Sequence, residues 1–301
     1  MAFPRILASG LAMLLCSVAS GAAAAAVLGD GVNLQPSYYA GGRPSFGWEL
    51  MKRHKKIKTV RFEIEPGKAA QAKEWIAQAK SHGYAVIATY HKVSALGSDE
   101  PSELLAAADW WRRNYADLAA SGPITVNLMN EWGSHDLTPA AYANAYNDAI
   151  AVVRSVYSGP IIIDVPGWGQ ETAVAAAAVK GQKGAAIQDR GIILSVHVYP
   201  SGWNQALKHA LRPSDLDDLA SAGRPCMLGE FGGEGSGKAD WSAIVAHAKS
   251  RGWPVLGWAW NGDGGGMNMV APPWTSDARA TAFAPAPYFD SIYSRLGDAG
   301  D

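Results

Sequence analysis

Short apolar runs recur along the chain, and alanine-rich or amphipathic stretches lie between them. The apolar runs lack regular polar alternation and are rich in Val, Ile and Leu, which is typical of strands covered on both faces. Eight β-strands are predicted, at Gly31–Leu34, Thr59–Ile64, Ala85–Tyr90, Ile124–Met129, Ile161–Val165, Ile192–Val198, Cys226–Leu228 and Val255–Trp260. The predicted helices include Ala69–Ser81, Glu103–Ala120, Pro139–Val156, Ala173–Lys180 and Ala239–Ser250. Alternating strands and helices predict a parallel sheet.

Eight such units predict an α/β fold, a (β/α)8 TIM barrel, rather than a doubly wound sheet. The first 26 residues read as a leader, which leaves about 275 residues, a size that fits one barrel. No Gly-x-Gly-x-x-Gly turn follows the first strand, so the dinucleotide-binding signature is missing. Residues 27–301 are therefore expected to form a single catalytic domain that needs no cofactor.

The leader has the composition of a secretory signal peptide. Arg5 precedes an apolar run over Ile6–Val18, and the small residues of Gly21–Ala26 follow it. This order of segments predicts cleavage near residue 26 and export to the periplasm or the medium. A lipid anchor at Cys16 is disfavoured because Leu15 stands where a small residue would be expected.

Composition and charge narrow the class of partner. After removal of the leader only Cys226 remains, so an intramolecular disulfide is not possible. A net charge of −1 and a pI near 6.7 give no electrostatic reason to expect a nucleic-acid or membrane partner. The 12 Trp and 11 Tyr suit stacking on sugar rings, although most Trp residues in any protein serve the core. The oligomeric state is not encoded in these features, and a monomer is the default expectation.

The ends of the predicted strands carry most of the candidate chemistry. In barrels of this kind the active site lies at the carboxyl ends of the strands. Those positions, together with residues that closely follow them, are Asn33, Arg61, His91, Asn130, Glu131, Trp168, His197, Tyr199, Glu230 and Trp260. The two glutamates fit glycoside hydrolysis, in which one carboxyl group protonates the departing oxygen and the other attacks or stabilises the sugar carbon.

Several of these residues also have a purely structural interpretation. Arg61 can form an internal ion pair with Glu63, or it can keep Glu230 ionised through a charge-assisted hydrogen bond. His197 and Tyr199 share one face of their strand, either as core residues or as groups that contact the sugar and the nucleophile.

The aromatic and loop candidates are assigned by position. Trp258 and Trp260 are expected to share a face, with Trp260 as the platform under the sugar and Trp258 as a barrel-filling residue. His91 is either a hydroxyl-binding residue or a loop residue. Asp263 lies in a glycine-rich loop and is interpreted as a turn residue rather than part of the cleft.

The sequence shows no motif for a metal site or for serine-hydrolase chemistry. The seven His residues show no metal-binding His-x-x-x-His spacing with a usable carboxylate, and the one Cys excludes thiolate clusters. No Ser lies in a Gly-x-Ser-x-Gly turn. Neither a metal site nor serine-hydrolase chemistry is predicted.

With these residues identified, the chain resembles glycoside hydrolase family 5 from Gly31 to about Trp260. The Asn130–Glu131 pair and the Gly229-Glu230-Phe231-Gly232 sequence match the family's two catalytic motifs. The resemblance implies that Glu131 is the acid/base and Glu230 the nucleophile. It also implies sugar-binding or supporting roles for Arg61, His91, His197, Tyr199 and Trp260.

Within that family the sequences at residues 163–170 and 258–262 resemble bacterial endo-β-1,4-mannanases. The chain departs from that group after the first strand, where Leu34-Gln35-Pro36 replaces an expected histidine, and in the loop at residues 92–99. The resemblance implies a retaining β-1,4-mannanase acting on a polysaccharide or oligosaccharide. A cellulase with the same residues and a non-catalytic carbohydrate-binding barrel are the alternatives, and endo versus exo action is open.

Overall fold

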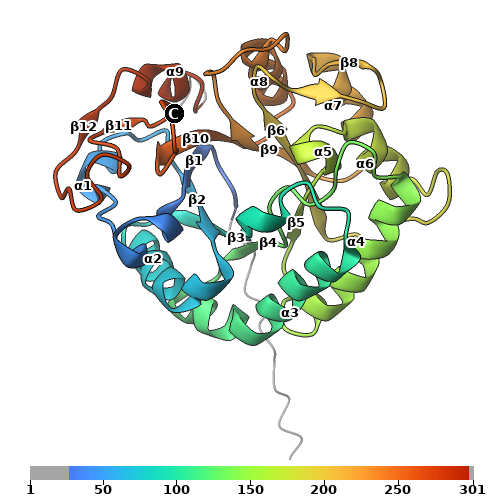
Figure 1. Ribbon diagram of the computed structural model, residues 1–301, viewed down its shortest axis with the longest axis horizontal. Helices are drawn as coiled ribbons and strands as arrows, with labels where there is room; N and C mark the ends of the chain where they lie inside the picture. The colour runs from blue at the N-terminus through green and yellow to red at the C-terminus, as the bar shows by residue number, and fades with distance from the viewer. Residues whose placement is uncertain (1–26, 298–301) are drawn as a thin grey trace, which may run out of the picture.

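The chain folds into a closed barrel of eight parallel strands surrounded by helices (Figure 1). The computed structural model describes residues 27–297, so the predicted signal peptide at residues 1–26 lies outside them. The strands are β1 (Gly31–Leu34), β2 (Thr59–Ile64), β3 (Ala85–Tyr90), β4 (Thr125–Asn127), β5 (Ile161–Asp164), β6 (Ile192–Val198), β9 (Cys226–Phe231) and β10 (Val255–Asn261). Their order around the barrel is β1-β10-β9-β6-β5-β4-β3-β2. The predicted (β/α)8 barrel is confirmed.

The helices form the outer ring. The main ones are α2 (Ala69–Ser81), α3 (Pro101–Leu118), α4 (Pro139–Arg154), α6 (Thr172–Val179), α7 (Pro213–Ala220) and α8 (Trp241–Ser250). Shorter ones are α1 (Trp48–Met51), α5 (Pro166–Gly169) and α9 (Phe289–Tyr293), with 3-10 turns at Pro36–Tyr38, Ala40–Gly42, Pro66–Lys68, Val93–Ala95 and Ala119–Ser121. Two small hairpins pair β7 (Trp203–Asn204) with β8 (His209–Ala210), and β11 (Val270–Ala271) with β12 (Ala284–Pro285). Across residues 27–297, no helix is long and apolar enough to cross a bilayer.

Helix α4 shows how the sequence specifies these elements. Thr138 caps its first turn by accepting a hydrogen bond from the backbone N–H of Ala141, 3.2 Å away, and a proline occupies the first helical position. Tyr142, Tyr146 and Ile150 are buried at intervals of four residues, so one face of the helix packs against the barrel.

The barrel interior changes from apolar to polar along the strands. Near the amino ends, Ile87, Ile162 and Met227 come from strands on different sides of the barrel and form one small apolar cluster with Leu256. Two residues further along β5, on the same strand face, stands Asp164. The polar layer therefore lies directly above an apolar floor, toward the carboxyl ends where an active site is expected.

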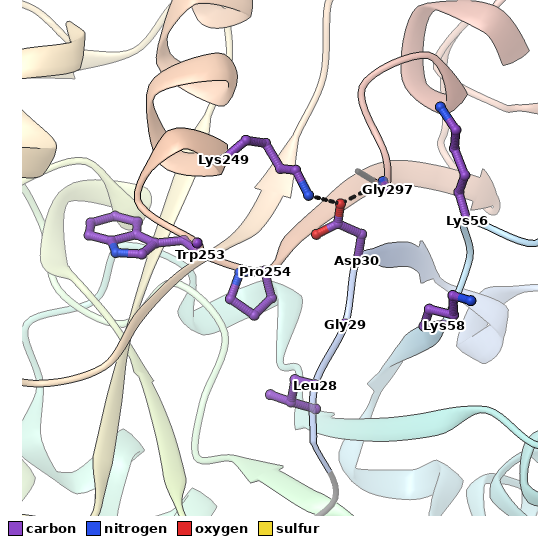
Figure 2. Close-up of a pocket in the computed structure, with 10 residues that line it drawn as sticks. Leu28, Gly29, Asp30, Lys56, Lys58, Lys249, Trp253, Pro254 and Gly297 are labelled. Carbon is purple, nitrogen blue, oxygen red and sulfur yellow. Dashed lines mark hydrogen bonds and ion pairs between the residues drawn. The ribbon is translucent and has the colours of Figure 1, made fainter. Parts of the chain in front are cut away.

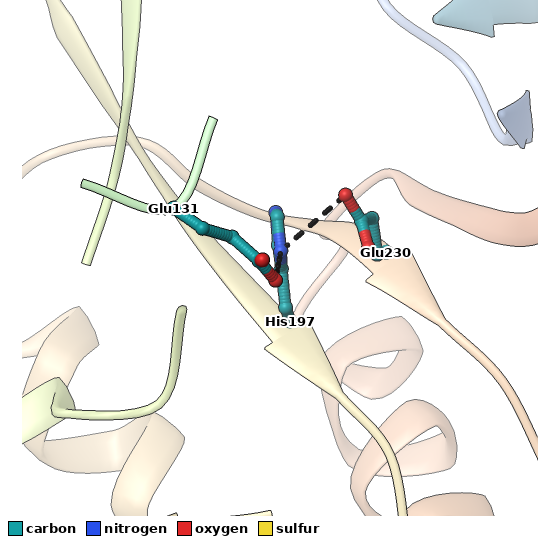
Figure 3. Close-up of side chains that lie close together, drawn as sticks. All are labelled: Glu131, His197 and Glu230. Carbon is teal, nitrogen blue, oxygen red and sulfur yellow. Dashed lines mark hydrogen bonds and ion pairs between the residues drawn. The ribbon is translucent and has the colours of Figure 1, made fainter. Parts of the chain in front are cut away.

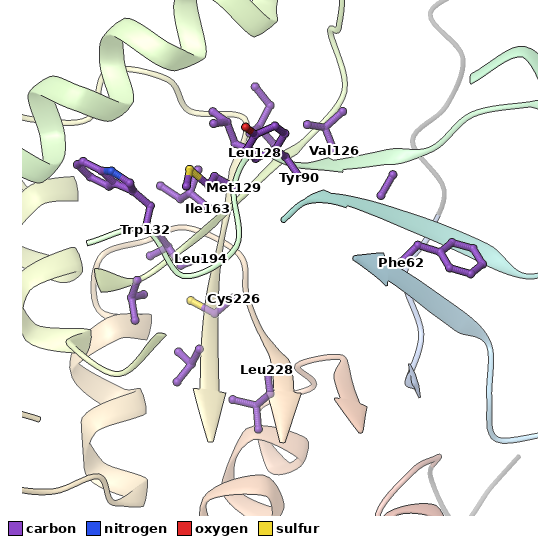
Figure 4. Close-up of a cluster of buried hydrophobic side chains, with 14 of the residues drawn as sticks. Phe62, Tyr90, Val126, Leu128, Met129, Trp132, Ile163, Leu194, Cys226 and Leu228 are labelled. Carbon is purple, nitrogen blue, oxygen red and sulfur yellow. The ribbon is translucent and has the colours of Figure 1, made fainter. Parts of the chain in front are cut away.

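A second, larger core lies between the strands and the helices. Figure 4 shows part of it, with Phe62, Val126, Ile163, Leu194 and Leu228 supplied by five different strands. All five are essentially buried. This apolar shell holds the strands in register, so polar groups in the interior are carried on a rigid frame.

Asp30 lies just before β1, at the amino ends of the barrel strands and opposite the polar layer (Figure 2). Its carboxylate accepts hydrogen bonds from the backbone N–H groups of Val255, at 3.0 Å, and Gly297, at 2.7 Å, and from the ammonium group of Lys249. Its carbonyl oxygen also accepts the N–H of Lys58 at 2.8 Å. One side chain thus links the first strand to α8, to the last strand and to the end of the described chain.

The Asp30→Ala variant is expected to lose stability without losing turnover. Removal of the carboxylate takes this acceptor away from the buried N–H of Val255, which costs about 1 to 3 kcal/mol. Each kcal/mol corresponds to a fall in Tm of about 2 to 4 °C in a domain of this size. Calorimetry would measure the change, with the exposed Asp117→Ala as the matched control, and an unchanged Tm would contradict the prediction.

Candidate active site

A pocket at the carboxyl ends of the strands is lined by five of the ten predicted site residues. Its lining residues are Gln35, Glu63, His91, Leu96, Asn130, Glu131, Tyr199, Glu230 and Trp258. They come from segments scattered over more than two hundred positions of sequence. The barrel brings them together because parallel strands present their carboxyl ends on one face.

Glu131 enters the pocket through an unusual backbone conformation. It follows β4 with φ at 47°, in the left-handed region that non-glycine residues rarely adopt. Its N–H donates to Oδ2 of Asp164 at 3.0 Å, and its carbonyl accepts the N–H of Gly97 at 2.8 Å. These two bonds hold the residue in place, and strained positions of this kind are concentrated at functional sites.

His197 lies between the two candidate glutamates (Figure 3). Its Nδ1 is 2.9 Å from Oε1 of Glu131 and 3.4 Å from Oε1 of Glu230, while Nε2 is 3.6 Å from Oδ2 of Asp164. Burial disfavours a charged ring, but Glu230, Asp164 and Glu131 together outweigh it and raise the pKa of His197 to about 9. At neutral pH the ring is therefore a cation between the two carboxyl groups.

Glu230, in β9, is held ionised. Nη1 of Arg61 donates to its Oε1 at 2.9 Å, and the phenol of Tyr199 donates to its Oε2 at 2.7 Å. Burial alone would raise the pKa of Glu230, but the charges of His197 and Arg61 and the Tyr199 hydrogen bond lower it to about 2. A buried carboxylate that stays charged over the whole working pH range is suited to nucleophilic attack.

Glu131 is shifted in the opposite direction. Burial is the main cause that raises its pKa, and the charges of Glu230 and Asp164 add to it against the His197 hydrogen bond. The pKa values of two neighbouring carboxyl groups are thus shifted in opposite directions, upward for Glu131 and downward for Glu230. This separation of pKa values is the pattern of an acid/base and a nucleophile.

The pH profile is expected to follow these shifts. Activity needs a protonated Glu131 and an ionised Glu230, so kcat/KM should fall as pH rises through the raised pKa of Glu131. In His197→Gln the hydrogen bond that lowers this pKa is weakened, and the alkaline limb should move to higher pH. Initial rates between pH 4 and pH 10, with the unaltered protein in parallel, would measure this. A shift of that limb to lower pH would contradict the assignment.

Arg61 is the centre of the polar layer. Its Nη1 donates to Asn33 at 2.8 Å, Glu63 at 3.1 Å and Glu230 at 2.9 Å, and its Nη2 donates to Asn130 at 2.5 Å. Both sequence interpretations therefore hold together: Arg61 forms the internal ion pair with Glu63 and also contacts Glu230. Asn33 is fully buried and supports Arg61 rather than lining the pocket.

The predicted sugar platform is wrong. Trp260 is fully buried and its Nε1 donates to the carbonyl of Phe46, while Trp258 lines the pocket. The alternation assumed for β10 is broken, because Val32 and Leu34 of β1 face Gly257 and Asn261. The step from Gly257 to Asn261 in β10 covers four residues, whereas the paired step from Val32 to Leu34 in β1 covers two. This irregularity prevents the two tryptophans from sharing a face.

The loop after β10 has a larger role than predicted. The carboxylate of Asp263 accepts the N–H groups of Gly265 at 2.8 Å and Met267 at 3.0 Å, as a turn residue does. It also accepts the Nε1 of Trp258 at 2.9 Å. Asp263 therefore fixes the orientation of the aromatic ring that lines the pocket.

Two candidates are placed near the pocket with roles still predicted only from sequence. Both ring nitrogens of His91 face acidic groups, Glu65 at 3.1 Å and Glu63 at 3.5 Å. Trp168 is 39% exposed and packs against His135, with ring centroids 5.3 Å apart. It does not line the pocket itself. Its contact with sugar stays a prediction.

The described residues contain one group with metal-ligating geometry. It consists of Glu131, His197 and Glu230, whose ligand atoms lie within 4.8 Å of one another. Both carboxyl groups already have protein partners, and two of the three atoms belong to the candidate catalytic pair. This distance is also short enough for both carboxyl groups to reach one sugar ring.

Comparisons with known proteins identify the family. Residues 43–264 match the family model described as cellulase (glycosyl hydrolase family 5). The chain belongs to glycosyl hydrolase family 5. The resemblance inferred from the two catalytic motifs is therefore confirmed at the level of the family.

The similar proteins include enzymes named as mannanases and as an endoglucanase. The mannan endo-1,4-beta-mannosidase of Streptomyces lividans is 30% identical over 70% of this chain and 57% of its own length. Thus the chain spans little more than half of that relative. A beta-mannanase from Thermomonospora fusca superposes with a TM-score of 0.69 at 23% identity, covering 88% of each chain. An endoglucanase from Thermobifida fusca gives 0.69 at 16% identity, covering 90% of this chain and 92% of its own. These structural likenesses support the same fold.

Two buried polar residues of this family 5 site, Asn127 and Asp164, are missing from the sequence prediction, and a third, Glu63, was predicted only as an ion-pair partner of Arg61. Asp164 directly follows Ile161-Ile162-Ile163, and Glu63 lies between Phe62 and Ile64, so a single acid in an apolar strand was the available signal. Asn127 and Asp164 contact each other from neighbouring strands, and Glu63 contacts Gln35 from the segment after β1, so these contacts are visible only once the barrel is closed.

Proposed function

We propose that this protein is a retaining glycoside hydrolase that cleaves β-1,4-linked polysaccharide, most favourably mannan, within the chain. The observation that carries the proposal is the spacing of Glu131 and Glu230, whose carboxyl oxygens lie within 4.8 Å. Retaining enzymes hold these groups about 5 to 5.5 Å apart, whereas inverting ones need about 6.5 to 9.5 Å to admit a water.

In the first step Glu131 donates its proton to the glycosidic oxygen while Glu230 attacks the anomeric carbon. The bond from that carbon to the leaving oxygen breaks, and an ester to Glu230 forms. Esterification removes the negative charge of Glu230, which is one of the causes of the raised pKa of Glu131. The pKa of Glu131 then falls, which suits its second role as a base.

In the second step the Glu131 carboxylate takes a proton from water, and the oxygen attacks the same carbon. The ester bond breaks, and Glu230 leaves as a carboxylate that Arg61 and Tyr199 stabilise. Two inversions leave the product with the configuration of the substrate. The enzyme ends in its starting protonation state.

Mannan is the preferred substrate in this proposal because the Streptomyces lividans relative is named a mannan endo-1,4-beta-mannosidase. The second candidate is a β-1,4-glucanase. The matching family model is described as cellulase, and the same two glutamates would serve that reaction. A signal peptide at residues 1–26 and secretion complete the proposal on sequence grounds, and a monomer is its default expectation.

The test is a substrate panel combined with product stereochemistry. Protein beginning at residue 27 would be assayed on galactomannan, glucomannan and carboxymethyl-cellulose in the presence of EDTA. Proton NMR would identify the anomer of the first product. Rapid cleavage of galactomannan with the β-anomer formed first is expected. A first-formed α-anomer would overturn the retaining mechanism, and preference for the cellulose derivative would favour the glucanase.

A further inference from the structure

Gln35 and Glu63 form a polar pair beside the nucleophile that the catalytic mechanism does not use. Both line the pocket that contains Glu131 and Glu230. Gln35 comes directly after β1, within the Leu34-Gln35-Pro36 segment where the sequence departs from the mannanase pattern. Glu63 lies in β2, two residues after Arg61.

The contacts of Glu63 tie this pair to the nucleophile. Nη1 of Arg61 donates to Oε1 of both Glu63, at 3.1 Å, and Glu230, at 2.9 Å. The side chain of Glu63 is 1% exposed and that of Glu230 is 5% exposed, so the two carboxyl groups share a cation away from bulk water. The pair therefore sits on the side of the pocket occupied by the sugar that Glu230 attacks.

The orientation of the Gln35 amide follows from its bond to Glu63. Nε2 of Gln35 donates to Oε2 of Glu63 at 2.6 Å, so this nitrogen is directed at the carboxyl group. The amide oxygen has no hydrogen-bond partner among the described residues, and the side chain is partly exposed. Gln35 therefore presents an acceptor to the pocket, and its natural partner is a hydroxyl donor.

The neighbouring histidine does not duplicate this function. Nδ1 of His91 lies 3.1 Å from Glu65 and 3.2 Å from the hydroxyl of Tyr38, and Nε2 lies 3.5 Å from Glu63. Both of its nitrogens thus face protein groups, and only 3% of the residue is exposed. Gln35 thus offers an open hydrogen-bonding atom to the pocket, whereas His91 does not.

We propose that Gln35 is a specificity-determining contact to a free hydroxyl of the sugar bound against Glu230, and that Glu63 is the residue that positions its amide. The proposal rests on the proposed glycosidase function and adds a substrate requirement to it. A sugar whose hydroxyl at this point is replaced by hydrogen or blocked by an ester cannot donate the bond. The site therefore selects unsubstituted segments of the polysaccharide.

A cycle of variants and substrates tests this contact. Values of kcat/KM would be measured on the parent β-1,4-linked oligosaccharide and on analogues that each lack one hydroxyl. The unaltered enzyme should lose about tenfold on one of these analogues. In Gln35→Leu, kcat/KM on the parent should fall about tenfold, and kcat/KM on that analogue should be no lower than on the parent. The exposed Gln188→Leu serves as the matched control and should behave as the unaltered enzyme.

Two variants separate positioning by Glu63 from a purely structural role. Glu63→Gln keeps an oxygen that can accept from Gln35, so discrimination against the analogue should persist. Glu63→Met removes that acceptor, and discrimination should disappear even where kcat on the parent is retained. Equal discrimination in Glu63→Met, at an unchanged fold, would overturn the positioning role.

The outcomes also separate this inference from the proposed function. If the unaltered enzyme cleaves the parent and Gln35→Leu matches it on every analogue, the contact is disproved while the glycosidase assignment stands. If the unaltered enzyme cleaves neither manno- nor cello-oligosaccharides, both proposals fail. Because Gln35 is partly exposed, its leucine variant should fold, which circular dichroism would check.

Discussion

Glu230→Ala is expected to reduce kcat on the polysaccharide by about 10⁴-fold or more. The alanine cannot form the ester on which the double displacement depends, and neighbouring groups cannot replace it. In the proposed mechanism Glu131, whose pKa is raised, acts as the acid, and Tyr199 donates a hydrogen bond to the carboxylate that this variant lacks. Release of reducing sugar, followed over hours at high enzyme concentration, would measure the residual rate.

The control for this experiment is Glu234→Ala, an exposed glutamate only four residues further along the chain. It should retain full activity. Added azide is small enough to enter the space left by the missing carboxylate, and it should yield a glycosyl azide of inverted configuration in Glu230→Ala. Retention of more than about one per cent of the rate without azide would contradict the nucleophile assignment.

Arg61→Met should affect both stability and activity. Breaking a buried ion pair from one side costs about 3 to 5 kcal/mol, because a carboxylate is left without its cation. Here the guanidinium contacts Glu63 and Glu230 and also three asparagines, so the loss of stability should reach that range. Turnover should fall as well, since the pKa of Glu230 is held low partly by this charge.

Denaturant unfolding of the Arg61 variant would measure the stability change, and the activity assay would be run well below its midpoint. Arg43→Met is the matched control, because Arg43 forms an exposed ion pair with Glu74 and should change stability by less than about 1 kcal/mol. An Arg61 variant as stable as the control would show that the polar layer does not depend on this cation. Retained turnover would separately contradict its support of Glu230.

The strands of this barrel were predictable because burial on both faces leaves a plain apolar signature. The predicted bounds of Thr59–Ile64, Ala85–Tyr90 and Ile192–Val198 match the structure. The fourth strand is shorter than predicted, Thr125–Asn127 instead of Ile124–Met129. Leu128 is nevertheless buried, so an apolar run can extend beyond the residues that pair in the sheet. Helix α7 was missed because only Leu216 and Leu219 mark its apolar face.

The candidate catalytic pair was selected from the sequence for a different reason. Each glutamate ends an apolar run and has a short recognisable neighbourhood, so position and chemistry coincide. Trp260 shows where this reasoning fails, because the irregular pairing of β10 is not written in the order of its side chains. Likewise the contacts of Glu63 with Gln35 and of Asp164 with Glu131 join segments far apart in the sequence, so the order of residues does not predict them. Side-chain type locates candidates, whereas register decides which way they point.

The linkage at Asp30 determines how this barrel can be joined to other proteins. Residues 30 and 297 are joined by a hydrogen bond at the face opposite the pocket. Asp30 precedes the first strand, whereas the pocket lies at the other ends of the strands. A module or surface tether attached through either position would leave the cleft unobstructed. The same proximity would let a short peptide bridge connect the two positions and allow new termini to be opened in an exposed loop.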